Sequence, residues 1–177
     1  YLDLDGFKQV NDRHGHETGD LLLVTKACDM QQALRESDTL ARLGGDEFVV
    51  VLQDLHDAPS ARPILERLLQ SIAQPLEVEG RQLSVTASLG VSFFDGREQG
   101  AQADADLLLR QAEQAMVQAK QAGRNRIQVF DAVQERQQRG RQEELQRIAE
   151  GLRTDEFTLH FQPKVNMRSG AVVGVEA

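Results

Sequence analysis

Two short stretches of this sequence place paired acids where they could bind a cation. "LARLGGDEFVV", residues 40–50, sets Gly44, Gly45, Asp46 and Glu47 between two apolar runs. Glycine reaches positive φ cheaply and allows another group to approach the backbone, so this turn leaves room for a phosphate. Mg²⁺ takes oxygen ligands, usually one or two carboxylates together with substrate phosphates. The turn therefore predicts a site for a metal and a phosphorylated ligand.

A second acidic pair, Asp3 and Asp5, lies in the apolar stretch that opens the chain. If this stretch is a strand beside the hairpin, Asp3 would share metal ions with Asp46 or Glu47. Carboxylates gathered at one sheet edge repel one another unless a cation is bound. The residues alone leave an alternative open, in which the hairpin tip is simply polar and its acids are solvated.

The apolar periodicity predicts the elements that position these acids. Strands are expected over residues 1–4, 39–42, 48–52 and 126–130, with a hairpin around Glu79-Gly80 whose second strand is long and alternating. Helical segments are expected over residues 5–12, 17–36, 58–75 and 104–123. The resulting order, β-α-β-β-α-β-β-α-β, favours an α/β fold: an α+β sandwich in which helices flank a mixed sheet.

Some core positions follow from helical spacing. In the helix over 17–36 the residues expected to face inward are Leu21, Val24, Ala27 and Cys28. In the helix over 104–123 they are Leu108, Ala112, Ala115, Met116 and Ala119. The histidines His14 and His16 lack the further ligands that a transition-metal site needs, so we expect packing roles in a loop. His56 and His160 are isolated and are expected on the surface or in strands.

Composition excludes several classes of protein. The chain has 177 residues, 40% hydrophobic and 27% charged, with 5% aromatics and no tryptophan. Its net charge of -8 argues against a broad nucleic-acid footprint, which needs a basic face. A single cysteine, Cys28, favours a reducing compartment. The strand-like runs at both ends predict that the chain is a piece of a larger protein.

Longer motifs are specific to one family. "DLDGFKQVND", "GHETGD" and "RLGGDEF", followed by "SVTASLGVSFF" and "AMVQAKQAGRNRI", resemble the GGDEF domain family of diguanylate cyclases. The polar stretch 131–153 fits a solvated helical linker. "FTLHFQPKVNMRSGAVVGVEA" then resembles the opening of an EAL phosphodiesterase domain. The expected domains are an N-terminally truncated GGDEF domain (1–130), the linker (131–153) and a truncated EAL domain (154–177), as in tandem GGDEF-EAL proteins.

The resemblance implies a fold and a reaction. The fold would be the palm of cyclases and polymerases. Two GTP molecules, one on each domain of a homodimer, would condense to cyclic di-GMP and pyrophosphate with Mg²⁺ or Mn²⁺ as cofactor. The domain would work in bacterial second-messenger signalling in the cytoplasm, either free or as the cytoplasmic part of a membrane-anchored protein. The alternative is a non-catalytic GTP-binding module that regulates an adjacent EAL phosphodiesterase.

The resemblance also implies roles for individual residues. The metal ligands would be Asp3, the carbonyl of Leu4, Asp46 and Glu47, and the last two would also be catalytic. Guanine would be read by Asn11 and Asp20, because their donors and acceptors match its edge. Phe7 and Leu23 would line the base pocket. The phosphates would lie against Gly44, Gly45, Lys8, Lys120 and Arg124.

Two further sets of residues come from the family pattern. Arg35 and Asp38, in "RESD", would form the inhibitory site where the product binds, since a guanidinium can bond a guanine face and a phosphate. A helix-end ion pair is the alternative for this motif. In the truncated EAL domain Gln162 would approach the cyclic dinucleotide and Glu176 would bind metal. Because the other carboxylates of a hydrolytic site are absent, this portion is expected to be inactive.

Overall fold

The computed structural model describes residues 1–55, 57–78, 80–94, 104–154, 156, 158 and 160–176. It divides the chain into two compact units, Tyr1–Phe130 and Asp131–Ala177. Two predicted positions lie outside the described residues. They are His56, expected on the surface or in a strand, and Glu79, expected in a hairpin turn.

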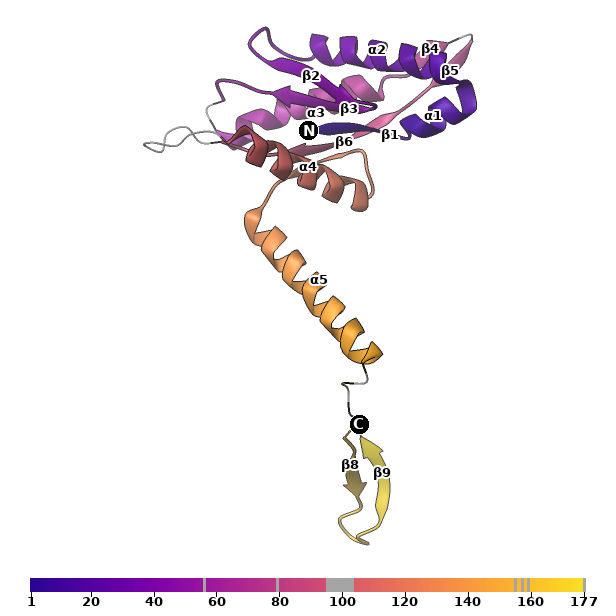
Figure 1. Cartoon of the computed structure of the whole chain (residues 1–177), viewed down its shortest axis with the longest axis vertical. Coiled ribbons are helices and arrows are strands. Elements are labelled where there is room, and N and C mark those ends of the chain that lie inside the picture. Colours follow the sequence, from indigo (N-terminus) through magenta and orange to yellow (C-terminus); the bar gives the residue numbers. More distant parts are fainter. Residues whose placement is uncertain are drawn as a thin grey trace. The chain divides into compact units, whose positions relative to one another are not determined.

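A five-stranded mixed sheet forms the centre of the first unit (Figure 1). Its strands are β1 (Leu2–Asp5), β2 (Thr39–Gly44), β3 (Glu47–Val51), β6 (Thr86–Val91) and β7 (Arg126–Val129), in the spatial order β2-β3-β1-β6-β7. Pairing is antiparallel except between β6 and β7, which run parallel. The predicted mixed α/β architecture is confirmed, and β1 with its acids lies in the middle of the sheet.

Side chains alternate between the two faces of β1, and this alternation separates its apolar residues from its acids. Leu2 pairs with Phe48 and with Leu89, and Leu4 pairs with Ala87. All of these apolar residues belong to one buried cluster. Asp3 and Asp5 consequently lie on the opposite face of the sheet, where Asp3 pairs with Glu47 on one side and with Ser88 on the other.

Helices cover both faces of the sheet. The helices α1 (Phe7–His14), α2 (His16–Gln32) and α3 (Arg62–Ala73) supply residues to the apolar cluster, and a short 3₁₀ turn, η1 (Ala58–Ala61), precedes α3. The face that carries the acids is covered by α4 (Ala105–Gln121). A Cβ on Gly90 would lie 1.9 Å from the carbonyl oxygen of Ala112, so glycine is what lets α4 approach β6 this closely.

The segment expected as one hairpin with a long second strand is divided into two parts. β4 (Leu76–Val78) and β5 (Arg81–Leu83) form a separate two-stranded sheet, and β6 begins only at Thr86. The predicted long strand is therefore wrong: Ser84 and Val85 interrupt it. Alternation of polar and apolar residues continues through this interruption, which is why the sequence did not indicate that the chain changes partners there.

The face of α2 that is buried differs from the predicted one. Leu21, Val24 and Cys28 are exposed, and the buried residues are instead Gly19, Leu22, Leu23, Lys26 and Met30. The apolar residues of α2 occur on all sides of the helix, so their spacing does not identify one buried face. The contacts of Lys26 identify the buried face. Its ammonium is 1% exposed and donates to the carbonyl of Gln74 at 2.6 Å and to Asp29 at 3.0 Å. Met116 and its neighbours Ala112, Ala115 and Ala119 are buried as predicted.

The second unit contains a long helix and a hairpin. The helix, α5 (Ala132–Arg153), occupies the stretch for which a helical linker is predicted, and β8 (Gln162–Val165) pairs with β9 (Val172–Glu176). The turn contains Gly170 at a φ of 66°. Among the described helices of both units, none has the length and apolar character needed to cross a bilayer.

Candidate functional site

The glycine turn between β2 and β3 is tightly built and open on its outer side. Gly45 has a φ of 53°, and its carbonyl accepts a hydrogen bond of 2.9 Å from Nε of Arg42. The strand register shifts between Arg42 and Gly44, so the tip departs from a regular ladder. A Cβ added to Gly44 or Gly45 would meet no atom within 4 Å. The space beside the turn is therefore free for a ligand.

The acids that follow the turn lie next to the acid of the central strand. Asp3 and Glu47 are direct partners across the β1–β3 ladder, and the amide of Leu4 donates to the carbonyl of Asp46 at 3.2 Å. Directly opposed residues of an antiparallel pair have Cβ atoms about 5 Å apart. The structure thus makes Asp3 and Glu47 neighbours across the two strands, as the sequence predicts for adjacent strands, and Asp46 contacts β1 through its backbone carbonyl.

Burial and neighbouring acids disfavour the charged form of Asp3. Burial raises the pKa of Asp3 above its ordinary value of 3.8, the Lys120 hydrogen bond opposes this effect, and the nearby charge of Asp46 adds to it. Burial and a hydrogen bond to Glu47 likewise raise the pKa of the Tyr1 hydroxyl to about 12. Tyr1 was not among the predicted site residues, because nothing in its sequence context marks it as a partner of Glu47.

The donor set fits a hard metal ion that also binds substrate. Within the described ranges, no three acidic, histidine or cysteine side chains are gathered closely enough to hold a metal by themselves. Mg²⁺ commonly keeps only one or two protein carboxylates and completes its shell with phosphates and water. Asp3, Asp46 and Glu47 supply oxygen ligands of that kind. His14 and His16 contribute nothing there, since they lie at the α1–α2 junction.

Two cations reach the same edge from α4 and the turn after it. The Lys120 ammonium lies 2.7 Å from Oδ2 of Asp3, and the Lys120 side chain is 33% exposed. Arg124 lies beyond the helix end with a φ of 61°, and its Nε is 3.9 Å from Oδ1 of Asp5. The predicted phosphate ligand Lys8 is exposed on α1 and has no hydrogen bond or ion pair within the described part of the chain.

Asp5 differs from Asp3 because hydrogen bonds already engage both of its oxygens. Oδ2 accepts from the Thr86 hydroxyl at 2.8 Å and from the Asn125 amide at 3.1 Å, while Oδ1 accepts from the Ser88 hydroxyl at 2.8 Å. Asp5 is therefore held by neutral hydrogen-bond donors of the protein, whereas Asp3 is paired with Lys120. Sequence reasoning did not find this role, since the partners of Asp5 are 81, 83 and 120 residues away.

A buried and unpaired oxygen lies between α1 and α2. Among the described residues, Oδ1 of Asn11 is the only buried side-chain polar atom without a hydrogen-bond partner. A Cβ on Gly19 would lie 1.8 Å from this oxygen and 3.4 Å from Phe7. Gly19 therefore makes the space that Asn11 occupies. Such an orphaned atom is costly unless a ligand or water satisfies it.

The other residues predicted to bind the base differ in how deeply they are buried. Phe7 and Leu23 are buried in the apolar cluster, at 8% and 4% exposure. Asp20 follows Gly19 on α2 and is exposed. The structure thus places Asn11, Gly19 and Phe7 in contact distance of one another, and it leaves Asp20 at the surface.

The two charged residues proposed for the inhibitory site, Arg35 and Asp38 of "RESD", lie in different environments. Asp38 is buried, and its carboxylate accepts hydrogen bonds from the amides of Arg35 at 2.9 Å and of Gln53 at 3.4 Å. The Arg35 side chain is exposed and has no hydrogen bond or ion pair among the described residues. No ion pair joins the two side chains in that part of the chain, so the alternative of a helix-end ion pair is not what the structure contains.

In the second unit, the residues predicted for the EAL domain are strand partners. Gln162 pairs with Glu176 across β8 and β9, and Nζ of Lys164 lies 3.1 Å from Oε2 of Glu176. All three side chains are exposed.

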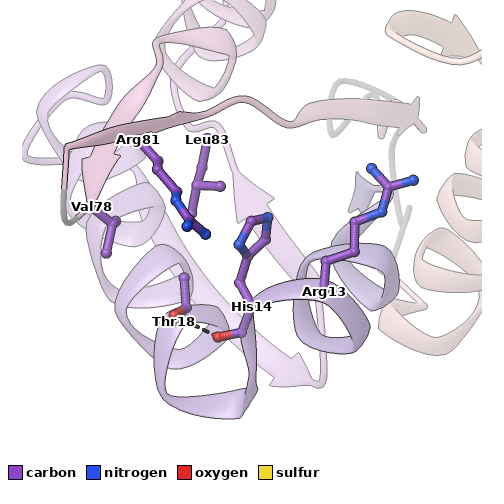
Figure 2. Close-up of a pocket in the computed structure, with 6 residues that line it drawn as sticks. All are labelled: Arg13, His14, Thr18, Val78, Arg81 and Leu83. Atoms are coloured by element: carbon purple, nitrogen blue, oxygen red, sulfur yellow. Dashed lines mark hydrogen bonds between the residues drawn. The ribbon is translucent and has the colours of Figure 1, made fainter.

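A cavity of ≈ 180 Å³ lies away from the acids, between the α1–α2 junction and the β4–β5 hairpin. Figure 2 shows the His14 ring and the Arg81 guanidinium pointing toward each other across it, with Thr18 below and Arg13 directed away. None of the predicted metal, guanine or phosphate ligands lines it. The residues of the candidate site therefore lie outside this hollow.

Comparison with known proteins identifies relatives of the whole chain. The family described as "Diguanylate cyclase, GGDEF domain" matches residues 1–126. The bifunctional diguanylate cyclase/cyclic di-GMP phosphodiesterase MucR of Pseudomonas aeruginosa is 36% identical over 177 residues, which are 100% of this chain and 25% of MucR. The cyclic di-GMP phosphodiesterase NbdA of the same organism is 39% identical over 182 residues, 100% of this chain and 21% of NbdA.

A solved structure agrees with the fold. The GGDEF domain of TpbB (YfiN) from Pseudomonas aeruginosa superimposes with a TM-score of 0.69 at 34% identity, covering 78% of each chain. The present chain spans a quarter or less of the length of the two curated relatives. The similarity therefore concerns this region of those larger proteins.

Proposed function

The chain belongs to the GGDEF domain family, and from that premise we propose that residues 1–130 form a diguanylate cyclase domain that condenses two GTP molecules to cyclic di-GMP and pyrophosphate. The observation that carries the proposal is the pairing of Asp3 with Glu47 beside the Gly44-Gly45-Asp46 turn. This pairing places carboxylates of the kind that phosphoryl transfer uses beside a glycine turn whose outer side is open, which supports the proposal.

Asp3, Asp46, Glu47 and the carbonyl of Leu4 would hold Mg²⁺ or Mn²⁺. When bound, the metal would offset the negative charge of the triphosphate. The raised pKa of Asp3 supports this assignment, because burial and the neighbouring acid Asp46 destabilise its charged form more than Lys120 stabilises it. Asp46 would also orient the attacking hydroxyl.

Guanine would be read at the α1–α2 junction. The unpaired Oδ1 of Asn11 is an acceptor for an N–H on the guanine edge, and Asp20 would accept from the N1 and N2 donors. Phe7 and Leu23 would support the base from the apolar cluster. Adenine would leave these acceptors unpaired, so the site should discriminate strongly against ATP.

The triphosphate would lie against Gly44 and Gly45 with Lys8, Lys120 and Arg124 around it. In each half of the reaction, the 3′-hydroxyl of one GTP gives up its proton and its oxygen forms a bond to the α-phosphorus of the other. The bond between that phosphorus and the bridging oxygen breaks, and pyrophosphate leaves with the electron pair. Because each domain holds one GTP, two copies of the chain would have to face each other, which makes a homodimer part of the proposal.

Product would also regulate the domain. The guanidinium of Arg35, which is exposed and has no partner among the described residues, is suited to bind a guanine face or a phosphate of cyclic di-GMP. Asp38 would help mainly by shaping the backbone on which Arg35 sits, since its carboxylate is engaged by two amides. We place the domain in the cytoplasm, where GTP is available.

Residues 131–153 and 154–177 would be a helical linker and the start of an EAL domain, with Gln162 near the dinucleotide and Glu176 as a metal ligand. The names of MucR and NbdA, both of which align over this whole chain, support that proposal. This portion alone is not expected to hydrolyse cyclic di-GMP. The alternative of a non-catalytic regulatory module is less favoured, because Asp3, Asp46, Glu47, Asn11 and Asp20 are all present.

Turnover of GTP by the full chain tests the proposal. With Mg²⁺ present, cyclic di-GMP should be detected by mass in the parent protein and not in an Asp46→Ala variant of equal melting temperature. GTP binding by a folded dimer without product would instead favour the regulatory module.

A further inference from the structure

Asp5 lies at the end of β1 with a side chain that is only 6% exposed. Its two oxygens receive three hydrogen bonds, from the hydroxyls of Thr86 and Ser88 on β6 and from the backbone amide of Asn125. Both oxygens are therefore occupied by protein donors. A carboxylate in this state is fixed in place and is poorly available as a metal ligand, unlike its neighbour Asp3.

The bond to Asn125 reaches a turn of unusual geometry. Gly123, Arg124 and Asn125 have φ values of 114°, 61° and 46°, so three consecutive residues are left-handed. Residues other than glycine adopt this region at a cost, and they persist there when surrounding contacts hold them. The turn is held by the amide of Arg124, which donates to the Ala119 carbonyl at 3.0 Å, and by the Asn125–Asp5 bond.

This turn determines where one cation of the site is presented. Arg124 is 63% exposed, and its Nε is 3.9 Å from Oδ1 of Asp5. Lys120 lies one helical turn earlier, against Asp3. If the turn relaxed, Lys120 would remain anchored by α4, but Arg124 would lose both its backbone conformation and the carboxylate that attracts its guanidinium.

We propose that Asp5 is a positioning residue for triphosphate binding, which acts by holding the Arg124–Asn125 turn so that the Arg124 guanidinium faces the phosphates. The proposal rests on the proposed function, in which Arg124 contacts the GTP phosphates. The ligand part concerned is the polyphosphate and not the base, because Asn11 and Gly19 lie at the α1–α2 junction and none of the three hydrogen bonds to Asp5 comes from α1 or α2.

The chemistry of the residue predicts a graded response to substitution. Asp5→Asn keeps the shape and one oxygen that can still accept from Asn125, but it removes the charge that attracts Arg124. Asp5→Ala removes both effects. We therefore expect GTP affinity to fall slightly in Asp5→Asn and by about tenfold in Asp5→Ala, the size expected when a hydrogen bond to a charged group is lost.

The test measures the Kd of GTP and of guanosine, in the presence of Mg²⁺, for the full chain and its variants. Asp5→Ala should weaken GTP binding while guanosine binding stays within about twofold of the parent. Asp106→Ala, which removes an exposed acid from the first turn of α4, is the matched control and should change neither. Equal weakening of GTP and guanosine by Asp5→Ala would overturn the proposal and indicate a general loss of structure.

A double-mutant cycle separates positioning from an independent effect. Because Asp5 is proposed to act through Arg124, the variant with Asp5→Ala and Arg124→Ala should bind GTP no more weakly than Arg124→Ala alone. Additive losses would overturn the proposal, and if Asp5→Ala does not fold, Asp5→Asn carries the same cycle.

Turnover measured on the same samples keeps the two proposals apart. GTP binding without cyclic di-GMP would overturn the cyclase alone, and turnover with no effect of Asp5 would overturn the positioning role alone. A parent chain that binds no GTP would overturn both.

Discussion

The Lys120 ammonium lies 2.7 Å from Oδ2 of Asp3, so a lysine of α4 neutralises the acid at the centre of the candidate metal site. Asp3 is the acid of β1 that pairs with Glu47. A divalent cation binding between these carboxylates would take over the role that Lys120 fills.

Asp3 should make the metal-free chain less stable as the pH rises. Burial raises its pKa above 3.8, although Lys120 opposes the shift. A carboxyl whose pKa is higher in the folded chain binds more protons when folded, so the free energy of unfolding falls as pH rises from 3.8 through the folded pKa. Without metal, Asp3→Asn is therefore expected to equal or exceed the parent in stability at pH 7.

Urea unfolding at a series of pH values checks this prediction. The stability advantage of Asp3→Asn should grow as the pH rises through that window. An advantage that shrinks with rising pH would contradict the sign of the shift. Mg²⁺ together with GTP should stabilise the parent, by about 2.7 kcal/mol at one hundred times Kd, and should have a much smaller effect on Asp3→Asn.

Asp46→Asn should lower turnover by at least about 10²–10³, the range seen when one electrostatic stabiliser is removed. The fold should survive, because the contact of Asp46 with β1 is made by its backbone carbonyl, which accepts from Leu4. Steady-state rates of cyclic di-GMP formation and circular dichroism of the same sample measure the two outcomes. Near-parental rates would remove Asp46 from the mechanism.

Gly19→Ala should impair guanine binding. The new Cβ would lie 1.8 Å from Oδ1 of Asn11, so the amide must move from its present position. Overpacking of this kind costs about 1–3 kcal/mol, which predicts a loss of GTP affinity on the order of tenfold and a smaller preference for GTP over ATP. Alanine favours a helix over glycine by about 1 kcal/mol, so the chain should stay folded.

Calorimetric titration with GTP and with ATP measures the effect of Gly19→Ala. Gly174→Ala is the matched control, because a Cβ there meets no atom within 4 Å. Unchanged discrimination in Gly19→Ala would show that the Asn11 amide does not read the base.

Arg35 and Asp38 should behave differently although they belong to one motif. Arg35→Ala should relieve inhibition by cyclic di-GMP and leave stability unchanged, since its side chain is exposed and unpaired in the described part of the chain. Asp38→Ala should destabilise the fold by about 1–3 kcal/mol, because two backbone amides lose their acceptor. Inhibition curves and denaturant midpoints test the pair, and equal inhibition of parent and Arg35→Ala would remove Arg35 from the product site.

Sequence alone determined the local features of this protein. Glycine at the tip of a hairpin, apolar alternation in the strands and the spacing of α3 and α4 are short-range patterns, and they identified the elements and the acids Asp3, Asp46 and Glu47. The predicted buried face of α2 was wrong because the helix carries apolar residues on all sides. Its orientation depends on the hydrogen bond between Lys26 and the carbonyl of Gln74, which is 48 residues away.

Only the tertiary structure decided which acids remain available for chemistry. Asp3 and Asp5 are two residues apart on the same face of β1, and the alternation of the strand does not distinguish them, although the family resemblance assigned a metal only to Asp3. Sheet register places Asp3 opposite Glu47 and near Lys120, whereas it places Asp5 beside Thr86, Ser88 and the turn at Asn125. A strand fixes which side chains share a face, but its neighbours across the sheet come from distant parts of the chain, and they determine what each side chain does.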